Sequence, residues 1–311
     1  MILSICIPTF NNPNVIVENV NKLKIQLSQF EGSFEIIIGE NFSNLDNRKK
    51  ILNVSSPNTK ITLHERNLGF GSNLYKTMME ASGDYILLLG DDDFPQFGLL
   101  IELMNCLNKK KDPGLIILPL NTGFDSSNLK YKSILPWVFM RSGSMMGLVF
   151  KRKNCIFDNL NFEKALYPQV DLSMRYVIDN GFVNIKFNNF IISGDGSPIN
   201  EKFNDKMQRP LDYGVLERCK IIFRLYSEKK INSKIVFLCL QKLFSWAINI
   251  YFDLKNKDRI LSKKYLKAIL FGFFNNKKYF IFTIFLFFIV FLLEYFRVWH
   301  KSITSIIFSK K

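Results

Sequence analysis

Three consecutive carboxylates, Asp91, Asp92 and Asp93, follow the apolar run YILLLG. Ionised together in a cleft they would repel one another, so they need protons, basic partners or a cation. Mg²⁺ or Mn²⁺ would take one or two of them and complete its shell with water and phosphate oxygens. A solvated acidic turn before a helix is the alternative. In an extended segment Asp91 and Asp93 project to one side, which makes Asp93 the expected principal metal ligand, supported by Asp91 or Asp92.

Short apolar runs alternate with helical patterns from the first residues onward, which predicts an α/β fold with a mostly parallel sheet flanked by helices. The expected strands are Leu3–Phe10, Phe34–Glu40, Lys60–His64, Tyr85–Leu89, Gly114–Pro119, Gly147–Phe150 and Val183–Phe187, and the expected helices are Val15–Phe30, Phe70–Ala81 and Phe97–Lys109. In such sheets ligands bind beyond the carboxyl ends of the strands. The residues that follow the first four strands are unusually polar, so we expect a binding site there.

Three segments carry a more specific signal, namely LSICIPTFNN, EIIIGENFS and ERNLGFGSNLYKTMMEASGDYILLLGDDDF. They resemble the nucleotide-binding half of family 2 glycosyltransferases with the GT-A fold. The resemblance is close over residues 2–105 and continues weakly to about residue 195. Its most specific parts are the opening IPTFNN, the spacing of Asn67, Gly69 and Asn73, and the entry ASGDYI into the acidic cluster.

The resemblance implies a set of nucleotide-binding residues, which are Pro8, Thr9, Asn11, Glu40, Asn67, Gly69, Asp84, Asp91 and Asp92. Glu40 stands where the family usually has an Asp that contacts the base, and Gly90 stands where many members have the first acid of a D-x-D-D arrangement. Asp84 would contact the base or order its loop; a capping carboxylate is its alternative. The resemblance further implies a divalent cofactor, Mn²⁺ or Mg²⁺, which would stabilise the departing diphosphate.

An inverting transfer also needs a base for the acceptor hydroxyl. The segment YPQVDL resembles the family's base-bearing segment, which makes Asp171 the expected catalytic base. Its alternative is an ordinary carboxylate in a first helical turn, and Asp195 is the reserve candidate. Ser142 and Ser144 lie where the family has its acceptor-side loop and could bind sugar hydroxyls; turn formation is the alternative that their residue type favours.

The basic charge of the chain is concentrated in its last third. The full sequence has 42 Lys and Arg against 27 Asp and Glu, whereas residues 214–311 hold 19 against 5 and also 15 of the 31 Phe. Basic residues interleaved with large apolar ones suit an anionic membrane surface better than nucleic acid. The apolar run Tyr279–Leu293 is short for a crossing. Extension to Trp299 would reach the needed length but would place Glu294 and Arg297 near one interface, so in-plane or re-entrant attachment is expected. A buried helical hairpin is the alternative.

These observations predict two parts. Residues 1–213 would form the GT-A domain, with a nucleotide-binding half at 1–105 and an acceptor-side half at 106–213. Residues 214–311 would form a helical, basic, Phe-rich membrane-associating tail. The five scattered cysteines and the distant His64 and His300 suggest neither structural zinc nor a catalytic triad. The start MILSICIPTF has no positively charged leader, so no secretory signal is expected.

The resemblance and the tail together imply a hexosyltransferase-type enzyme at the cytoplasmic face of the inner membrane. It would move a sugar from a nucleotide-diphospho-sugar to a lipid-linked oligosaccharide during synthesis of a bacterial surface polysaccharide such as capsule or O-antigen. The alternative is a membrane-tethered nucleotide-sugar binder or assembly protein whose metal site has degenerated at Gly90 and Glu40.

Overall fold

The computed structural model describes residues 2–30, 32–109, 114–118, 131–155, 165–183, 191–193, 214–257, 260 and 262–266. The chain divides into two compact units, Met1–Asn204 and Asp205–Lys311. The expected division after residue 213 stays a prediction, because residues 194–213 lie outside the described residues.

The first unit is built on a mixed sheet with the strand order β3-β2-β1-β4-β7-β6-β8. β1, β2, β3 and β4 are mutually parallel, β7 runs antiparallel to both β4 and β6, and β8 is parallel to β6. The bounds are β1 Leu3–Thr9, β2 Phe34–Glu40, β3 Thr59–Leu63, β4 Tyr85–Leu88, β6 Leu115–Ile117, β7 Leu148–Lys151 and β8 Phe182–Val183. β5 Asp93–Pro95 and β9 Ile191–Ser193 form a separate antiparallel pair. The expected mostly parallel sheet is confirmed.

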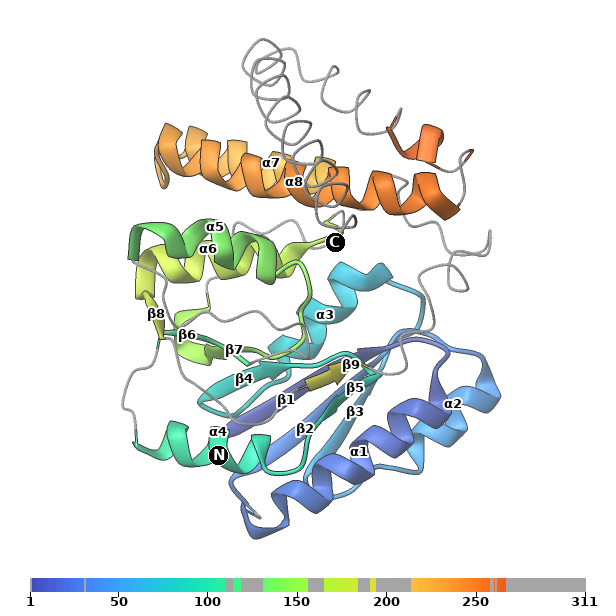
Figure 1. Cartoon of the computed structure of the whole chain (residues 1–311). Helices are drawn as coiled ribbons and strands as arrows, with labels where there is room; N and C mark the ends of the chain where they lie inside the picture. The colour runs from blue at the N-terminus through green and yellow to red at the C-terminus, as the bar shows by residue number, and fades with distance from the viewer. Residues whose placement is uncertain are drawn as a thin grey trace, which may run out of the picture. The chain divides into compact units, whose positions relative to one another are not determined.

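Helices cover both faces of this sheet (Figure 1). α1, α2 and α4 lie on one face and α3, α5 and α6 on the other. Their bounds are α1 Pro13–Leu27, α2 Leu45–Leu52, α3 Gly69–Met79, α4 Leu99–Lys109, α5 Tyr131–Arg141 and α6 Pro168–Asn180. Short 3₁₀ turns occupy Ser28–Phe30 and Arg152–Asn154.

Every residue of β1 is buried, as expected for a strand that is covered on both faces. Alternate residues Leu3, Ile5 and Ile7 join the core cluster beneath α1 and α4. Cys6 points the other way, and its thiol contacts the Thr77 carbonyl oxygen on α3 at 3.6 Å. The apolar side chains of the run LSICI therefore pack against the helices on both faces of the sheet.

The second unit contains α7, Val215–Ser227, and α8, Ser233–Lys257. The two helices pack together through apolar side chains, and the Arg218 guanidinium lies 4.9 Å from the ring centre of Trp246. By length and composition alone, the stretch Ser233–Tyr251 could cross a membrane, with a mean hydropathy of 1.2. Core helices of other proteins share these properties, so the stretch does not by itself define a span. The expected membrane segment at residues 279–299 lies outside the described residues.

Candidate active site

The first four strands of the sheet bring their carboxyl ends to one edge. The parallel register places Thr9 beside Glu40 and Glu40 beside Leu63. β4 continues the same edge, since Cys6 pairs with Leu88. The polar segments after β1, β2, β3 and β4 are therefore neighbours in space, as the sequence predicted.

The acidic loop after β4 is fixed to β1 and α1. The Thr9 hydroxyl donates to Asp91 Oδ2 at 2.7 Å. The side-chain amide of Asn19, buried on α1, donates to the carbonyl oxygens of Gly90 and Asp91 at 3.4 and 3.2 Å. Asp93 closes the loop, because its carboxylate accepts a hydrogen bond from the backbone N–H of Gly90. The carboxylates are thus held in place before any ligand binds.

Asp93 points inward. Only 1% of Asp93 is exposed, and burial raises the pKa of its carboxyl to about 7. The hydrogen bond from the Gly90 N–H and the charge of Arg141 lower this pKa, whereas the charges of Asp92 and Asp91 raise it further. Burial lowers the pKa of Arg141 to about 10, and the charge of Asp93 partly opposes this lowering. Asp91 and Asp92 are partly exposed. Asp91 and Asp92 are therefore the more accessible carboxylates, and Asp93 lies beneath them. The expectation that Asp93 is the principal metal ligand stays a prediction.

The acidic loop fits a divalent cation as a partial ligand set. Asp93 Oδ1 is buried and has no hydrogen-bond partner among the described residues. A Cβ at Gly90 would lie 2.8 Å from Asp93 Oδ2 and 3.0 Å from Asp92 Oδ1, so these carboxylates occupy the space that a side chain at position 90 would need. Within the described parts of the chain, no group of three His, Cys, Asp or Glu side chains has the arrangement of a complete metal centre. Water and donor phosphate oxygens would therefore supply the remaining ligands.

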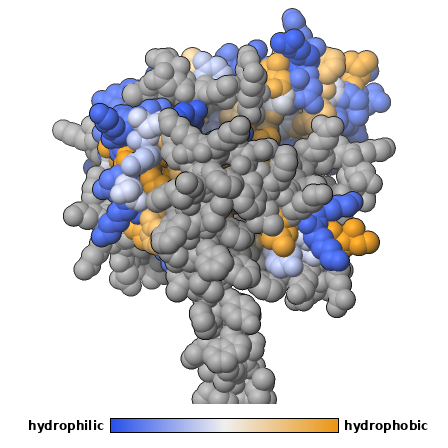
Figure 2. All heavy atoms as spheres, turned by 90° about the horizontal axis from the view of Figure 1, so that it is seen from above, coloured by the Kyte–Doolittle hydropathy of each residue, from blue (hydrophilic) through white to orange (hydrophobic). Residues whose placement is uncertain are grey.

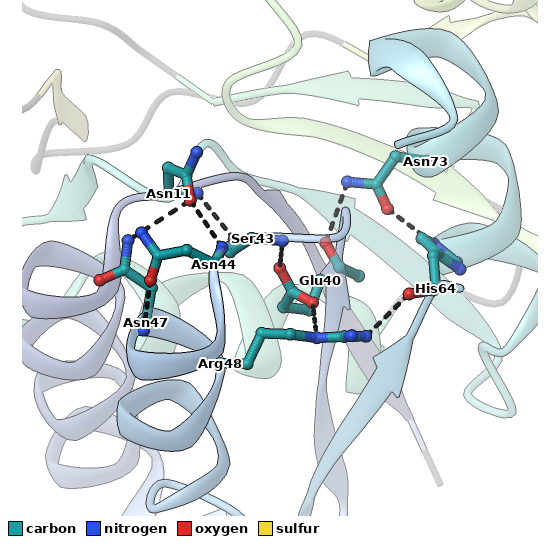
Figure 3. Close-up of polar contacts among 9 residues, drawn as sticks. Asn11, Glu40, Ser43, Asn44, Asn47, Arg48, His64 and Asn73 are labelled. Atoms are coloured by element: carbon teal, nitrogen blue, oxygen red, sulfur yellow. Dashed lines mark hydrogen bonds and ion pairs between the residues drawn. The ribbon is translucent and has the colours of Figure 1, made fainter. Parts of the chain in front are cut away.

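The loops after β1 and β2 are joined to each other. The Asn11 backbone N–H donates to Ser43 Oγ at 2.8 Å, and Asn11 Oδ1 accepts from the Asn44 N–H at 3.2 Å (Figure 3). Asn11 adopts a positive φ of 53°, which an Asn tolerates better than most residues. Pro8 lies one residue before Thr9 within β1 and is paired with Gly39.

The loop after β3 joins this arrangement through two asparagines. The side-chain amide of Asn41 donates to Asn67 Oδ1 at 3.0 Å, and the same oxygen accepts the Gly69 N–H at 2.9 Å. Gly69 has a φ of 76°, a left-handed conformation that favours glycine. Thr9, Asn11, Asn67, Gly69 and Asp91 therefore belong to one continuous edge.

Glu40 is completely buried at the end of β2. Its Oε1 accepts the Ser43 N–H at 2.6 Å, and its Oε2 lies 2.7 Å from Arg48 Nε on α2. Both carboxylate oxygens are thus engaged inside the protein. Because the side chain is completely buried, a direct hydrogen bond between Glu40 and a nucleobase would require the loop after β2 to move.

Asp84 is in the wrong place for a base contact. It precedes β4, whose first residue, Tyr85, pairs with Leu3 at the start of β1. Thr9 lies at the opposite end of β1, about 20 Å away at 3.3 Å per residue. Asp84 is exposed, and its carbonyl oxygen accepts the Arg152 N–H at 2.8 Å. The expected nucleotide contact is therefore incorrect, because ASGDYI enters the strand at the amino edge of the sheet.

Asp171 lies in the first turns of α6 and is 2% exposed. Its Oδ1 accepts a hydrogen bond from Arg175 Nε, one turn later, at 3.1 Å. Gln169, two residues earlier, donates to the Gly143 carbonyl oxygen at 3.1 Å and ties the start of α6 to the loop after α5. The structure thereby brings Asp171 near the segment of Ser142 and Ser144.

The Ser142 hydroxyl and the Ser144 backbone N–H both make hydrogen bonds within the end of α5. Ser142 is fully buried, and its hydroxyl donates to the Val138 carbonyl oxygen at 2.6 Å. The backbone N–H of Ser144 donates to the Arg141 carbonyl oxygen at 3.3 Å, within the turn that ends α5. These contacts favour the turn-forming alternative for both residues, and most clearly for Ser142.

Sequence reasoning missed several residues of this edge. Asn19, Arg48 and Arg141 are polar residues on helices, and their contacts connect positions far apart in the chain. Phe10 and Phe42 are 41% and 46% exposed in the loops after β1 and β2. An aromatic residue placed among the polar residues after a strand was the available signal for both.

A mostly parallel sheet covered on both faces, with a fixed acidic loop at its carboxyl edge, defines an α/β protein whose ligand site is expected beyond the carboxyl ends of the strands. The sequence model of "Glycosyl transferase family 2" matches residues 4–161, which is just over half of the chain. The protein belongs to glycosyltransferase family 2, and its first unit has the GT-A fold.

Individual relatives agree with this assignment. A stretch of 116 residues is 30% identical to abequosyltransferase RfbV of Salmonella typhimurium, covering 36% of this chain and 34% of the relative. The match therefore spans about a third of the length of that relative. The structure is similar to S. aureus TarS 1–349, with a TM-score of 0.57, 15% identity and coverage of 88% of this chain and 81% of that chain. It is also similar to mannosyltransferase PcManGT from Pyrobaculum calidifontis, with a TM-score of 0.58, 9% identity and coverage of 94% and 86%.

Proposed function

We propose that this protein is a metal-dependent, inverting glycosyltransferase. It would transfer a sugar from a nucleotide-diphospho-sugar to a lipid-linked glycan during synthesis of a surface polysaccharide. The observation that carries the proposal is the contact between Thr9 and Asp91, because it places the acidic loop against the loop expected to meet the nucleotide. TarS has been solved with UDP-GlcNAc, and PcManGT with GDP-Man and Mn²⁺.

The residues divide the chemistry among them. Asp91 and Asp92, together with the buried Oδ1 of Asp93 beneath them, would hold the cation, which supplies charge stabilisation for the diphosphate leaving group when it is bound. Thr9 and Asn19 keep the loop of these carboxylates in register with β1. Asp171 would accept the proton of the acceptor hydroxyl as the new glycosidic bond forms at the anomeric carbon. Arg175 orients the Asp171 carboxylate from one helical turn away.

Substitution of Asp92 tests the metal-dependent part of the proposal. Asp92→Asn keeps the size of the side chain but removes its charge, so we expect Mn²⁺-dependent donor hydrolysis or transfer to fall by at least about 10²-fold. The assay would use a panel of CDP-, UDP-, GDP- and dTDP-sugars with and without Mn²⁺. Glu18→Gln, which removes an exposed carboxylate on α1, is the matched control and should leave the rate unchanged.

Turnover of Asp92→Asn at the wild-type rate would remove Asp92 from the site. A wild-type protein that binds a nucleotide sugar but turns none over, with any metal or acceptor, would instead establish the non-catalytic binder. The two functions are thus separated by one set of measurements.

The second unit is proposed to bind the cytoplasmic face of the inner membrane, peripherally or as a re-entrant segment. Two exposed lysines, Lys229 in the turn after α7 and Lys234 in the first turn of α8, are suited to anionic headgroups. Figure 2 shows a face on which hydrophobic side chains of described residues lie next to strongly hydrophilic ones.

Truncation after residue 213 tests the membrane proposal. The full chain should sediment with phosphatidylglycerol vesicles, and the truncated chain should stay in the supernatant while still binding its nucleotide. Neutral phosphatidylcholine vesicles provide the control for charge. Sedimentation of the truncated chain with the anionic vesicles would contradict the assignment of membrane binding to the tail.

A further inference from the structure

The loop after β2 contains a residue whose backbone conformation is costly. Phe42 has a φ of 65°, in the left-handed region that bulky residues rarely adopt. Glycine would adopt this conformation without strain. Strained positions of this kind persist where the surrounding structure enforces them, and they cluster at binding sites. Phe42 as a whole is nevertheless 46% exposed, so burial of the residue does not compensate for the strain.

A network of polar contacts enforces this conformation (Figure 3). On one side of Phe42, the buried carboxylate of Glu40 accepts the Ser43 N–H at 2.6 Å. The same carboxylate pairs with Arg48 Nε at 2.7 Å, and Arg48 Nη2 donates to the His64 carbonyl oxygen at 2.7 Å. His64 is fixed in turn by a 3.0 Å contact between its Nε2 and Asn73 Oδ1. The guanidinium of Arg48 is therefore held between β2 and the end of β3.

This fixed guanidinium also contacts the phenyl ring. Arg48 Cζ lies 5.5 Å from the centroid of the Phe42 ring, within the range of a cation–π interaction. The ring thus has a rigid cationic neighbour while nearly half of the surface of Phe42 remains exposed. An aromatic surface held in this way loses little freedom when a second flat group packs against it.

The position of the ring suggests what that second group is. Ser43, the next residue, accepts the Asn11 backbone N–H at 2.8 Å, so the Phe42 loop is fastened to the loop after β1. That loop is expected to contact the nucleotide. Because Glu40 is completely buried, it presents no exposed oxygen to a base, and a π face is a partner that every nucleobase can use.

We propose that Phe42 is a further donor-binding residue, whose exposed phenyl face stacks on the nucleobase while Arg48 and Glu40 hold the ring in position. The inference rests on the proposed function, since it requires a nucleotide donor at this edge of the sheet. In this arrangement Glu40 is a positioning residue: it fixes the loop through Ser43 and Arg48 and makes no hydrogen bond to the base.

Calorimetric titration of the full-length protein with CDP, UDP, GDP, ADP and dTDP in the presence of Mn²⁺ tests the proposal. Phe42→Leu should raise the Kd of the tightest nucleotide by about tenfold or more, because it removes the π face and keeps an apolar side chain. Phe42→Tyr keeps the ring and should stay within about threefold of wild type. Tyr226→Leu, which removes an aromatic residue of similar exposure (42%) in the second unit, is the matched control and should change nothing.

Two further measurements separate stacking from a structural role. Affinity for inorganic pyrophosphate should be the same in wild type and Phe42→Leu, since pyrophosphate has no base. Phe42→Gly should lose nucleotide affinity while its unfolding temperature stays equal or rises, because glycine relieves the positive φ. An unchanged nucleotide Kd in Phe42→Leu, or an equal loss for pyrophosphate, would overturn the inference and leave the proposed function standing. If the wild type binds none of the five nucleotides, both the Phe42 inference and the proposed function are overturned.

Discussion

Replacement of Asp171 by asparagine is expected to reduce sugar transfer by at least about 10²-fold while leaving nucleotide binding close to the wild-type value. Asparagine has nearly the same shape as aspartate, but its amide cannot accept the proton of an acceptor hydroxyl. Donor binding should persist because Asp171 lies on α6, outside the loops that follow β1, β2 and β3. Single-turnover transfer and nucleotide titration on the same preparation would measure both quantities.

Asp179 offers a control on the same helix. It is exposed near the end of α6, so Asp179→Asn should retain full activity. A loss of less than about tenfold in Asp171→Asn would assign the proton to another group. Asp195 would be examined next; it lies outside the described residues.

The second large effect concerns folding stability. Arg48→Met should lower the free energy of unfolding by about 3–5 kcal/mol, because it leaves the completely buried Glu40 carboxylate without its cationic partner. Urea unfolding followed by circular dichroism would measure the loss. The double variant Glu40→Gln/Arg48→Met should recover part of it, since the uncompensated charge is then gone.

An exposed ion pair gives the reference for this measurement. Lys22 and Glu18 pair on the surface of α1, with side chains 51% and 60% exposed. Lys22→Met should therefore change the free energy of unfolding by less than about 1 kcal/mol. Similar losses for Lys22→Met and Arg48→Met would show that the buried pair contributes no more than a surface contact.

The sheet could be predicted from sequence because its strands are continuous apolar runs. β1 and β2 were expected within one residue of their observed bounds, since both are buried on two faces. α2 was not expected, because Ile51 is its only buried residue among the eight. Its one available signal was Asn44, whose side chain accepts the Asn47 N–H at the start of the helix. β5 was also missed, since it has three residues and its partner strand begins at Ile191.

The candidate site could be predicted only where topology decides it. Thr9, Asn11, Asn67 and Asp91 share one edge because parallel strands end there. Contacts between distant parts of the chain could not be predicted, such as the hydrogen bonds from Asn19 to the Gly90 and Asp91 carbonyl oxygens. Asp84 lies at the other edge of the sheet because its motif, ASGDYI, precedes a strand, whereas the other motifs follow one.

The hydrogen bonds from Asn19 carry a consequence for how this protein could change its substrate. The acidic loop takes its position from a residue in the middle of α1, and α1 in turn rests on buried Ile16, Val20 and Leu23. Because protein interiors are close-packed, we expect a change of one methylene among these aliphatic residues to shift α1 and, through Asn19, the acidic loop. New donor preferences can therefore arise from the hydrophobic interior, without exchange of any polar residue at the surface.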